Sequence, residues 1–235
     1  MAYPEAAAAL ADCVSEAAGV APGDVVLEAG SGRGDNVLRL LERFGASRVL
    51  GLNLSPAETE AARGRLRAEV LEGRASLRQG DVGSLLGTVA PASVDRVVAV
   101  DCAYHFVTRA SFLRSASRAL RDGGGLAAAD IVAAPVADAS MLQAAGWLFG
   151  IPAENLRTAA ELESDFVLAG FSQVSIADRT DVVIAGFAAH ARGQMLRGGA
   201  VDGLAFLLVG VVMTLLTWSG LFRYVIAKGV ARSAD

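Results

Sequence analysis

Residues 27–36 read LEAGSGRGDN and place three glycines at alternating positions directly behind an apolar run. The run Val25–Ala29 predicts a buried strand, and from Asp35 onward the apolar residues recur at helical spacing. Glycine is the residue that tight turns and close approaches to the backbone require. The stretch therefore predicts a strand, a glycine turn and a helix, with backbone N–H groups facing the crevice beyond the strand end.

The spacing of this turn indicates the charge of its ligand. An acid, Glu28, precedes the glycines in the order acid-x-Gly-x-Gly-x-Gly, which differs from the G-x-G-x-x-G dinucleotide fingerprint. A pyrophosphate at a helix N-terminus is disfavoured by a carboxylate beside it. The pattern therefore favours a cationic ligand over a dinucleotide.

Strand-like and helix-like segments alternate through the first half of the chain. The expected strands are Val25–Ala29, Arg48–Asn53, Ala75–Gln79, 95–100 and 125–132, and the expected helices are 35–44, 56–72 and 109–121. Such alternation predicts βαβ units and a parallel sheet. Ser55 and Pro56 are suited to open the second helix. The glycines of DGGG, residues 122–125, are expected to end the third helix and turn the chain into the fifth strand.

Four ordered segments resemble the class I S-adenosylmethionine-dependent methyltransferases. The glycine turn is the first, and GLNLSPAETEAAR (51–63) is similar to the family's G-x-x-x-S-x-x-x-x-x-x-A-R segment. QGDV (79–82) is similar to its third signature, and SVDRVVAVDCAYHF (93–106) followed by SRALRDGGGLAAADI (117–131) to its fourth strand, helix and glycine turn. The resemblance implies an α/β Rossmann-like fold: a mostly parallel seven-stranded sheet with an antiparallel last strand and helices on both faces.

The same resemblance implies S-adenosyl-L-methionine as cofactor. The glycines would let its methionine part lie against the backbone, Glu28 would order the loop, and Asp81 with the following amide would meet the adenine. Asn53 stands where the family usually carries an acid for the ribose hydroxyls. The expected cofactor residues are Glu28, Gly30, Ser31, Gly32, Gly34, Asn53, Leu54, Asp81, Val82 and Asp101. Two alternatives stay open: the glycines could simply pack a helix on a strand, and Asp81 could be a turn residue.

DCAYHF, residues 101–106, follows the fourth strand at the edge where α/β sheets bind ligands. Tyr104 and His105 are the candidate catalytic residues, because a histidine titrates in the range that suits a general base. The alternative is a structural histidine that donates to a backbone carbonyl. No metal is expected, since the histidines are isolated and no Cys/His ligand spacing occurs.

Composition excludes some functions. The 235 residues carry a net charge of −4, with a pI of about 5.3 and 53% hydrophobic residues, so we expect a globular chain that offers no basic surface to nucleic acid. Cys13 and Cys102 are expected to be reduced thiols. The first residues show no cationic signal region, which favours a cytoplasmic location.

The sequence predicts one methyltransferase domain. It comprises an N-terminal helix in 1–24, a cofactor-binding core in 25–132, and a substrate cover with the last strands in 133–235. The cover is expected at 137–152, where Met141, Trp147 and Phe149 would wall an apolar pocket or pack in the core. A sixth strand is expected in 172–180 and an antiparallel last strand in 221–229.

The stretch 203–222 contains no charged residue. If its end is a sheet strand, the remaining apolar helix, near 204–217, is too short to span a membrane and is expected to be buried. A homodimer interface and contact with a membrane surface are the alternatives. The predicted function is methyl transfer to a small, apolar metabolite by in-line displacement. The alternative is a membrane-associated or scaffolding protein on a methyltransferase fold with weak cofactor binding.

Overall fold

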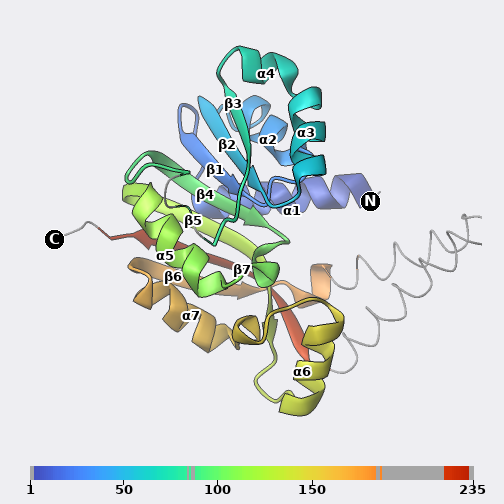
Figure 1. Cartoon of the computed structure of the whole chain (residues 1–235). Helices are drawn as coiled ribbons and strands as arrows, with labels where there is room; N and C mark the ends of the chain where they lie inside the picture. Colours follow the sequence, from blue (N-terminus) through green and yellow to red (C-terminus); the bar gives the residue numbers. More distant parts are fainter. Residues whose placement is uncertain (1–2, 84, 86–87, 184–185, 187–219, 233–235) are drawn as a thin grey trace, which may run out of the picture.

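The computed structural model describes residues 3–83, 85, 88–183, 186 and 220–232, which form a central sheet with helices on both faces (Figure 1). In chain order the elements are α1 (Tyr3–Ala18), β1 (Val25–Ala29), α2 (Asp35–Glu42), β2 (Arg48–Asn53), α3 (Pro56–Arg65), α4 (Arg67–Leu71), β3 (Ala75–Gln79), β4 (Val94–Val100), the 3₁₀ helix η1 (Ala103–His105), α5 (Arg109–Ala119), β5 (Leu120–Ala133), α6 (Ala139–Leu148), the 3₁₀ helix η2 (Ala153–Asn155), α7 (Ala159–Leu168), β6 (Phe171–Asp178) and β7 (Phe222–Ala231).

Seven strands within the described residues form one sheet in the order β3-β2-β1-β4-β5-β7-β6. Neighbouring strands from β3 to β5 are parallel, whereas β7 runs antiparallel to both β5 and β6. This arrangement confirms the predicted sheet with its antiparallel last strand. The chain order reverses between β1 and β4, and open α/β sheets bind their ligands at the carboxyl ends of the strands beside such a point.

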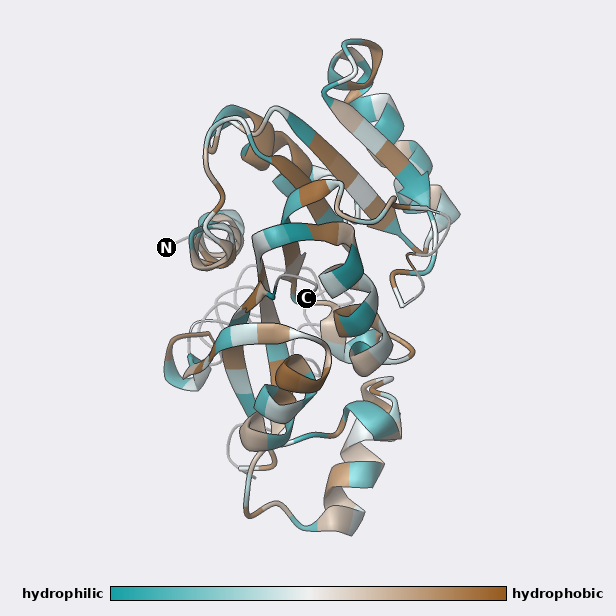
Figure 2. Ribbon diagram, turned by 90° about the vertical axis from the view of Figure 1, so that its left-hand side faces the viewer, coloured by the Kyte–Doolittle hydropathy of each residue, from teal (hydrophilic) through white to brown (hydrophobic). Residues whose placement is uncertain are grey.

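The strands at the centre of the sheet are hydrophobic, whereas α3 is hydrophilic along much of its length (Figure 2). Helices α1, α2 and α3 contribute buried side chains to one apolar cluster, which contains Val26 of β1. Helices α5 and α7 contribute to another, which contains Leu27 of the same strand. Because successive side chains of a strand point to opposite faces, these clusters lie on the two sides of the sheet.

The DGGG segment does not form the predicted turn. Helix α5 ends at Ala119, and residues 122–125 lie inside β5, where the register with β4 shifts between Val94 and Arg96. A Cβ on Gly125 would lie 2.1 Å from the carbonyl oxygen of Ala18. The glycine is therefore needed because α1 packs directly against an irregular part of the strand.

The predicted helix 56–72 is also interrupted, since α3 ends at Arg65 and α4 begins at Arg67. Leu66 between them is buried and has non-helical backbone angles. Its side chain packs beside Gly34 of the glycine turn. The interruption thus places Leu66, between β2 and β3, beneath the glycine turn that follows β1.

The expected apolar cover differs from the observed one. Trp147 and Met141 of α6 are 85% and 55% exposed, so neither packs in the core. Phe149 packs in a small cluster with Ile151, Leu221 and Phe222. Gly146 is the one buried residue among the described residues of α6, and the helix therefore turns most of its apolar side chains outward.

Residues 203–219 of the uncharged stretch, including the helix expected near 204–217, lie outside the described residues, as does His190. Phe222 does belong to a sheet strand, as the short-helix prediction requires. In the part of the chain that is described, no helix has the length and apolar character needed to cross a membrane. Burial, dimer contact and membrane contact of 203–219 stay predictions.

Candidate active site

A cavity of about 520 Å³ lies at the carboxyl ends of β1, β2 and β4, at the point of chain reversal. Its lining comes from the glycine turn, the end of β2, the start of α3, the segment after β3 and the turn after β4. The lining residues are Gly30, Gly32, Asn53, Leu54, Glu58, Gly80, Asp81, Val82, Val100, Asp101, Cys102, His105, Phe106 and Val107. Segments far apart in the sequence thus meet at one site of cofactor size.

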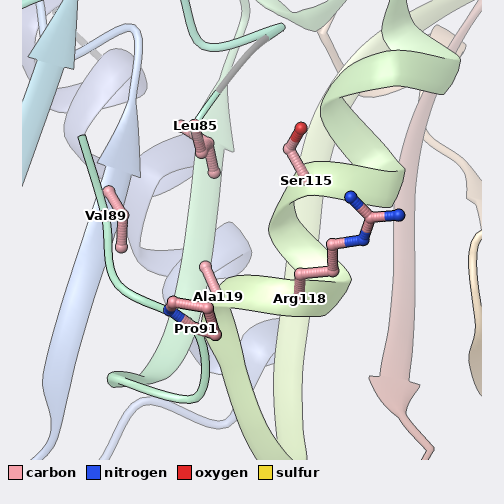
Figure 3. Close-up of a pocket in the computed structure, with 6 residues that line it drawn as sticks. All are labelled: Leu85, Val89, Pro91, Ser115, Arg118 and Ala119. Atoms are coloured by element: carbon pink, nitrogen blue, oxygen red, sulfur yellow. The ribbon is translucent and has the colours of Figure 1, made fainter. Parts of the chain in front are cut away.

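A second hollow, between α5 and the segment before β4, is much smaller (Figure 3). It measures about 20 Å³, and Leu85, Val89 and Pro91 face Ser115, Arg118 and Ala119 across it. Such a space holds about one water molecule. The larger cavity is therefore the candidate active site.

The three glycines of the turn have different reasons to be glycine. All have positive φ, of 75° at Gly30, 49° at Gly32 and 82° at Gly34. A Cβ on Gly30 would lie 2.6 Å from Cys102 Sγ, whereas one on Gly32 would meet no atom within 4 Å. Gly32 therefore presents bare backbone to the cavity. Gly30 leaves room for the side chain of Cys102, which follows β4.

Gly34 is outside the cavity lining. A Cβ there would lie 2.6 Å from Leu66 Cδ1. Ser31, predicted with the glycines, is buried and also outside the lining. The structure thus divides the turn into a ligand-facing part at Gly30 and Gly32 and a part at Gly34 that packs on the second crossover.

Glu28 lies beneath the turn, buried, with its Oε2 atom lacking a hydrogen-bond partner in the structure. Burial raises the pKa of Glu28 to about 8, and the neighbouring Asn36 side chain opposes that rise only in part. The carboxyl group is consequently neutral near pH 7. It does not supply the carboxylate charge that the sequence pattern indicated beside a cationic ligand, and it lies outside the cavity lining.

Asn53 stands where the sequence resemblance led us to expect an acid, and a carboxylate of the following helix, α3, lies beside it. Asn53 Nδ2 donates to Glu58 Oε2 at 2.8 Å, and both residues line the cavity. Glu58 is fixed in the first turn of α3, where its N–H donates to the Ser55 hydroxyl that caps the helix. An amide and a carboxylate thus act as a pair at the end of β2.

Asp81 and Val82, which are predicted to meet the adenine of the cofactor, line the cavity, as does Leu54, which is 70% exposed. Asp81 Oδ1 also accepts from the N–H of Gly83 at 2.8 Å. The two readings of Asp81 are therefore compatible, because one side chain shapes a turn and borders the cavity.

Asp101 lies at the end of β4 with φ of 55°, a left-handed conformation that is uncommon outside glycine. Its Oδ1 accepts from the hydroxyls of Tyr104 at 3.1 Å and Tyr224 at 3.2 Å. Burial, and next the charge of Asp101, raise the pKa of both phenols. Both tyrosines are therefore neutral donors that hold Asp101, and Tyr104 is outside the cavity lining.

His105 lines the cavity and its Nδ1 lies 3.0 Å from the carbonyl oxygen of Gly150. A carbonyl can only accept, so Nδ1 is the donor in this bond and Nε2 is the ring nitrogen that the bond leaves free. The expected bond to a backbone carbonyl is present and His105 also borders the cavity, while its role as a general base stays a prediction.

Several lining residues were not among the expected cofactor or catalytic residues. Cys102 Sγ donates to the carbonyl oxygen of Ala29 at 3.2 Å, and burial raises the pKa of this thiol. Both cysteines are free, as predicted. Phe106 and Val107 add an apolar wall next to His105. Among the described residues, no group of three His, Cys, Asp or Glu side chains could hold a metal ion.

Comparisons with known proteins agree with this geometry. A model of the methyltransferase domain family matches residues 26–124. Erythromycin 3''-O-methyltransferase from Saccharopolyspora erythraea is 33% identical over 128 residues, and methyltransferase GfsG from Streptomyces halstedii is 38% identical over 128 residues. Each alignment covers 54% of this chain, and the chain covers 41% and 45% of these relatives, less than half of their lengths.

Solved structures extend the likeness to nearly the whole chain. One is the structure of a putative sarcosine dimethylglycine methyltransferase from Galdieria sulphuraria, with a TM-score of 0.82 at 14% identity. The alignment covers 97% of this chain and 86% of the Galdieria chain. The [4+2]-cyclase SpnF has a TM-score of 0.80 at 19% identity, over 100% of this chain and 85% of its own. At such identities the likeness shows the fold alone.

The fold is shared with solved methyltransferase structures. The matched core, residues 26–124, contains all the residues that line the cavity. The SpnF structure, named as a cyclase, shows that this fold also occurs in proteins named for other reactions. The reaction of this chain must therefore be argued from its own residues.

Proposed function

We propose that the chain is an S-adenosylmethionine-dependent methyltransferase that acts on a hydroxyl group of a small, apolar metabolite. The observation that carries the proposal is the cavity at the chain reversal, where Gly32 presents bare backbone and three acidic side chains border the space. The match to the methyltransferase domain supports the cofactor, and an O-methyltransferase among the curated relatives supports the hydroxyl acceptor.

The residues present suit such a cofactor. Asn53 and Glu58 would hold its ribose hydroxyls, and Asp81 and Val82 would meet its adenine. Gly30, Gly32 and the Asp101 carboxylate would face its cationic methionine part. In this proposal Glu28 keeps the loop in shape from below rather than contacting the cofactor.

When bound, the cofactor supplies an electrophilic methyl group on a positively charged sulfur. The residues of the chain then have to orient the acceptor and exclude water, and such orientation can supply up to about 7–11 kcal/mol in ideal cases. Phe106 and Val107 provide an apolar wall on the acceptor side. His105 Nε2 takes the proton of the acceptor hydroxyl, while the bond from Nδ1 to Gly150 fixes the ring.

Transfer of label from methyl-labelled S-adenosylmethionine to a panel of hydroxylated apolar metabolites tests the proposal. We expect a methylated product together with an equal amount of S-adenosylhomocysteine. Cofactor binding without transfer to any hydroxyl would contradict the acceptor class. Absence of cofactor binding would instead favour the membrane-associated or scaffolding alternative.

A further inference from the structure

Three buried polar side chains lie behind the turn that carries His105. Arg109 begins α5, Asp130 lies in β5 and Asn155 ends η2, and their exposed fractions are 2%, 1% and 2%. Arg109 Nη1 donates to Asp130 Oδ2 at 2.7 Å, and Nη2 donates to the carbonyl oxygen of Asn155 at 2.6 Å. All three lie outside the cavity lining.

The carboxamide of Asn155 makes hydrogen bonds through both its nitrogen and its oxygen. Its Nδ2 donates to the carbonyl oxygens of Tyr104 at 3.0 Å and Phe106 at 2.7 Å, and its Oδ1 accepts from the N–H of Arg109 at 2.9 Å. A reversed amide would place Oδ1 against two carbonyl oxygens. The network therefore fixes the orientation of the side chain.

Both carbonyls that Asn155 binds belong to the neighbours of His105. The segment after α6, which contains Asn155, also supplies the carbonyl oxygen of Gly150 as acceptor for His105 Nδ1. The segment after α6 thus holds the turn at its backbone through Asn155 and at its side chain through Gly150. The ion pair of Arg109 and Asp130 in turn holds Asn155 against the end of β5.

We propose that Asn155 is a positioning residue, which holds the 104–106 turn so that His105 keeps its Nδ1 proton on Gly150 and leaves Nε2 free to accept a proton. Its effect on turnover rests on the proposed function. Its effect on the ring is a property of the protein without ligands. A purely structural role would lower the melting temperature and leave the histidine tautomer unchanged in the folded fraction.

The tautomer can be read from ¹⁵N shifts of the ring nitrogens by NMR. The chain contains two histidines, so the spectrum of His105→Ala assigns the signal. We expect the Nδ1-protonated form in the parent and a mixture with the Nε2-protonated form in Asn155→Asp, which retains the shape of the side chain but loses both donors. Turnover should fall at least tenfold, while affinity for S-adenosylhomocysteine stays within twofold.

Thr158→Ala is the matched control, because it removes the capping box of α7 and does not contact the turn. It should lower the melting temperature without changing the tautomer or turnover. Should Asn155→Asp fail to fold, Asn155→Ser serves in its place. An unchanged tautomer in the folded variant would overturn the proposal. If the parent binds no cofactor, the proposed function fails, but the tautomer comparison still decides the role of Asn155.

Discussion

The two sides of the cavity are built in different ways. On the cofactor side, the turn after β1 and the end of β2 rely on backbone conformation and on contacts between near neighbours in sequence, such as Asn53 with Glu58. On the acceptor side, the turn at His105 is held by Asn155, a residue of another segment. The cofactor side thus depends on the backbone conformation of its turn, which packs on Leu66 and Cys102, and the acceptor side depends on side-chain hydrogen bonds from a distant segment. Substitutions on the two sides should therefore have different effects.

The largest effect is expected from His105→Gln on the acceptor side. Without a basic ring nitrogen, turnover should fall roughly 10²- to 10⁴-fold, the range typical of general bases. Affinity for S-adenosylhomocysteine should stay within twofold, because the cofactor side is untouched. Steady-state kinetics and calorimetry measure the two quantities. Unchanged turnover would remove His105 from the mechanism.

Glu28→Gln tests the one buried carboxyl beneath the cofactor side. The folded-state pKa of Glu28, about 8, exceeds its unfolded value of 4.5, so the unfolded chain releases this proton first as the pH rises. The stabilising contribution of protonated Glu28 is therefore fully present below about pH 4.5. Between about pH 4.5 and 8 the free energy of unfolding falls by about 1.4 kcal/mol per pH unit.

Urea unfolding of parent and Glu28→Gln across this pH range measures the difference. The free energy of unfolding of the parent should fall relative to that of the variant between pH 4.5 and 8, and then run parallel. A difference that does not change with pH would show that Glu28 is ionised in the folded protein.

Gly32→Val should weaken cofactor binding about a hundredfold, or about 2.8 kcal/mol, because its side chain enters space that the structure leaves open. Gly73→Val is the matched control. Gly73 also has a positive φ, of 76°, and open space around it, but lies outside the cavity lining. Equilibrium dialysis with labelled cofactor compares them, and equal losses would assign the effect to backbone strain.

Glu58→Gln should give the smallest loss, about tenfold in cofactor affinity, or about 1.4 kcal/mol. The variant retains the size of the side chain but replaces a charged acceptor with a neutral one. Calorimetry with S-adenosylhomocysteine measures the change. An affinity equal to that of the parent would mean that Asn53 holds the ribose hydroxyls without Glu58.

This contrast explains how far the sequence could predict the molecule. The parallel core follows from the alternation of strand-like and helix-like segments, whereas the antiparallel last strand and the place of Asp81 at the cavity follow from the resemblance to a known family. The prediction for the DGGG segment was wrong, because the segment lies inside β5, where Gly125 makes room for α1. No local pattern could reveal Tyr224 or Asn155, since their roles arise only when distant segments fold together.

The pairing of Asn53 with Glu58 lies between these extremes. The two residues are five positions apart, and the Ser55 cap that orients Glu58 was predicted. The departure at Asn53 could have prompted a search for a carboxylate in the first turn of the following helix. What sequence could not supply was the direction of the Glu58 side chain, which depends on how α3 packs.

Calorimetric titration of S-adenosylhomocysteine into the parent protein tests the central claim most directly. The account predicts one site of micromolar affinity, because the bare backbone at Gly32 and the acidic groups around it form a preorganised pocket for this ligand. No binding heat at millimolar ligand, with the protein folded, would contradict it.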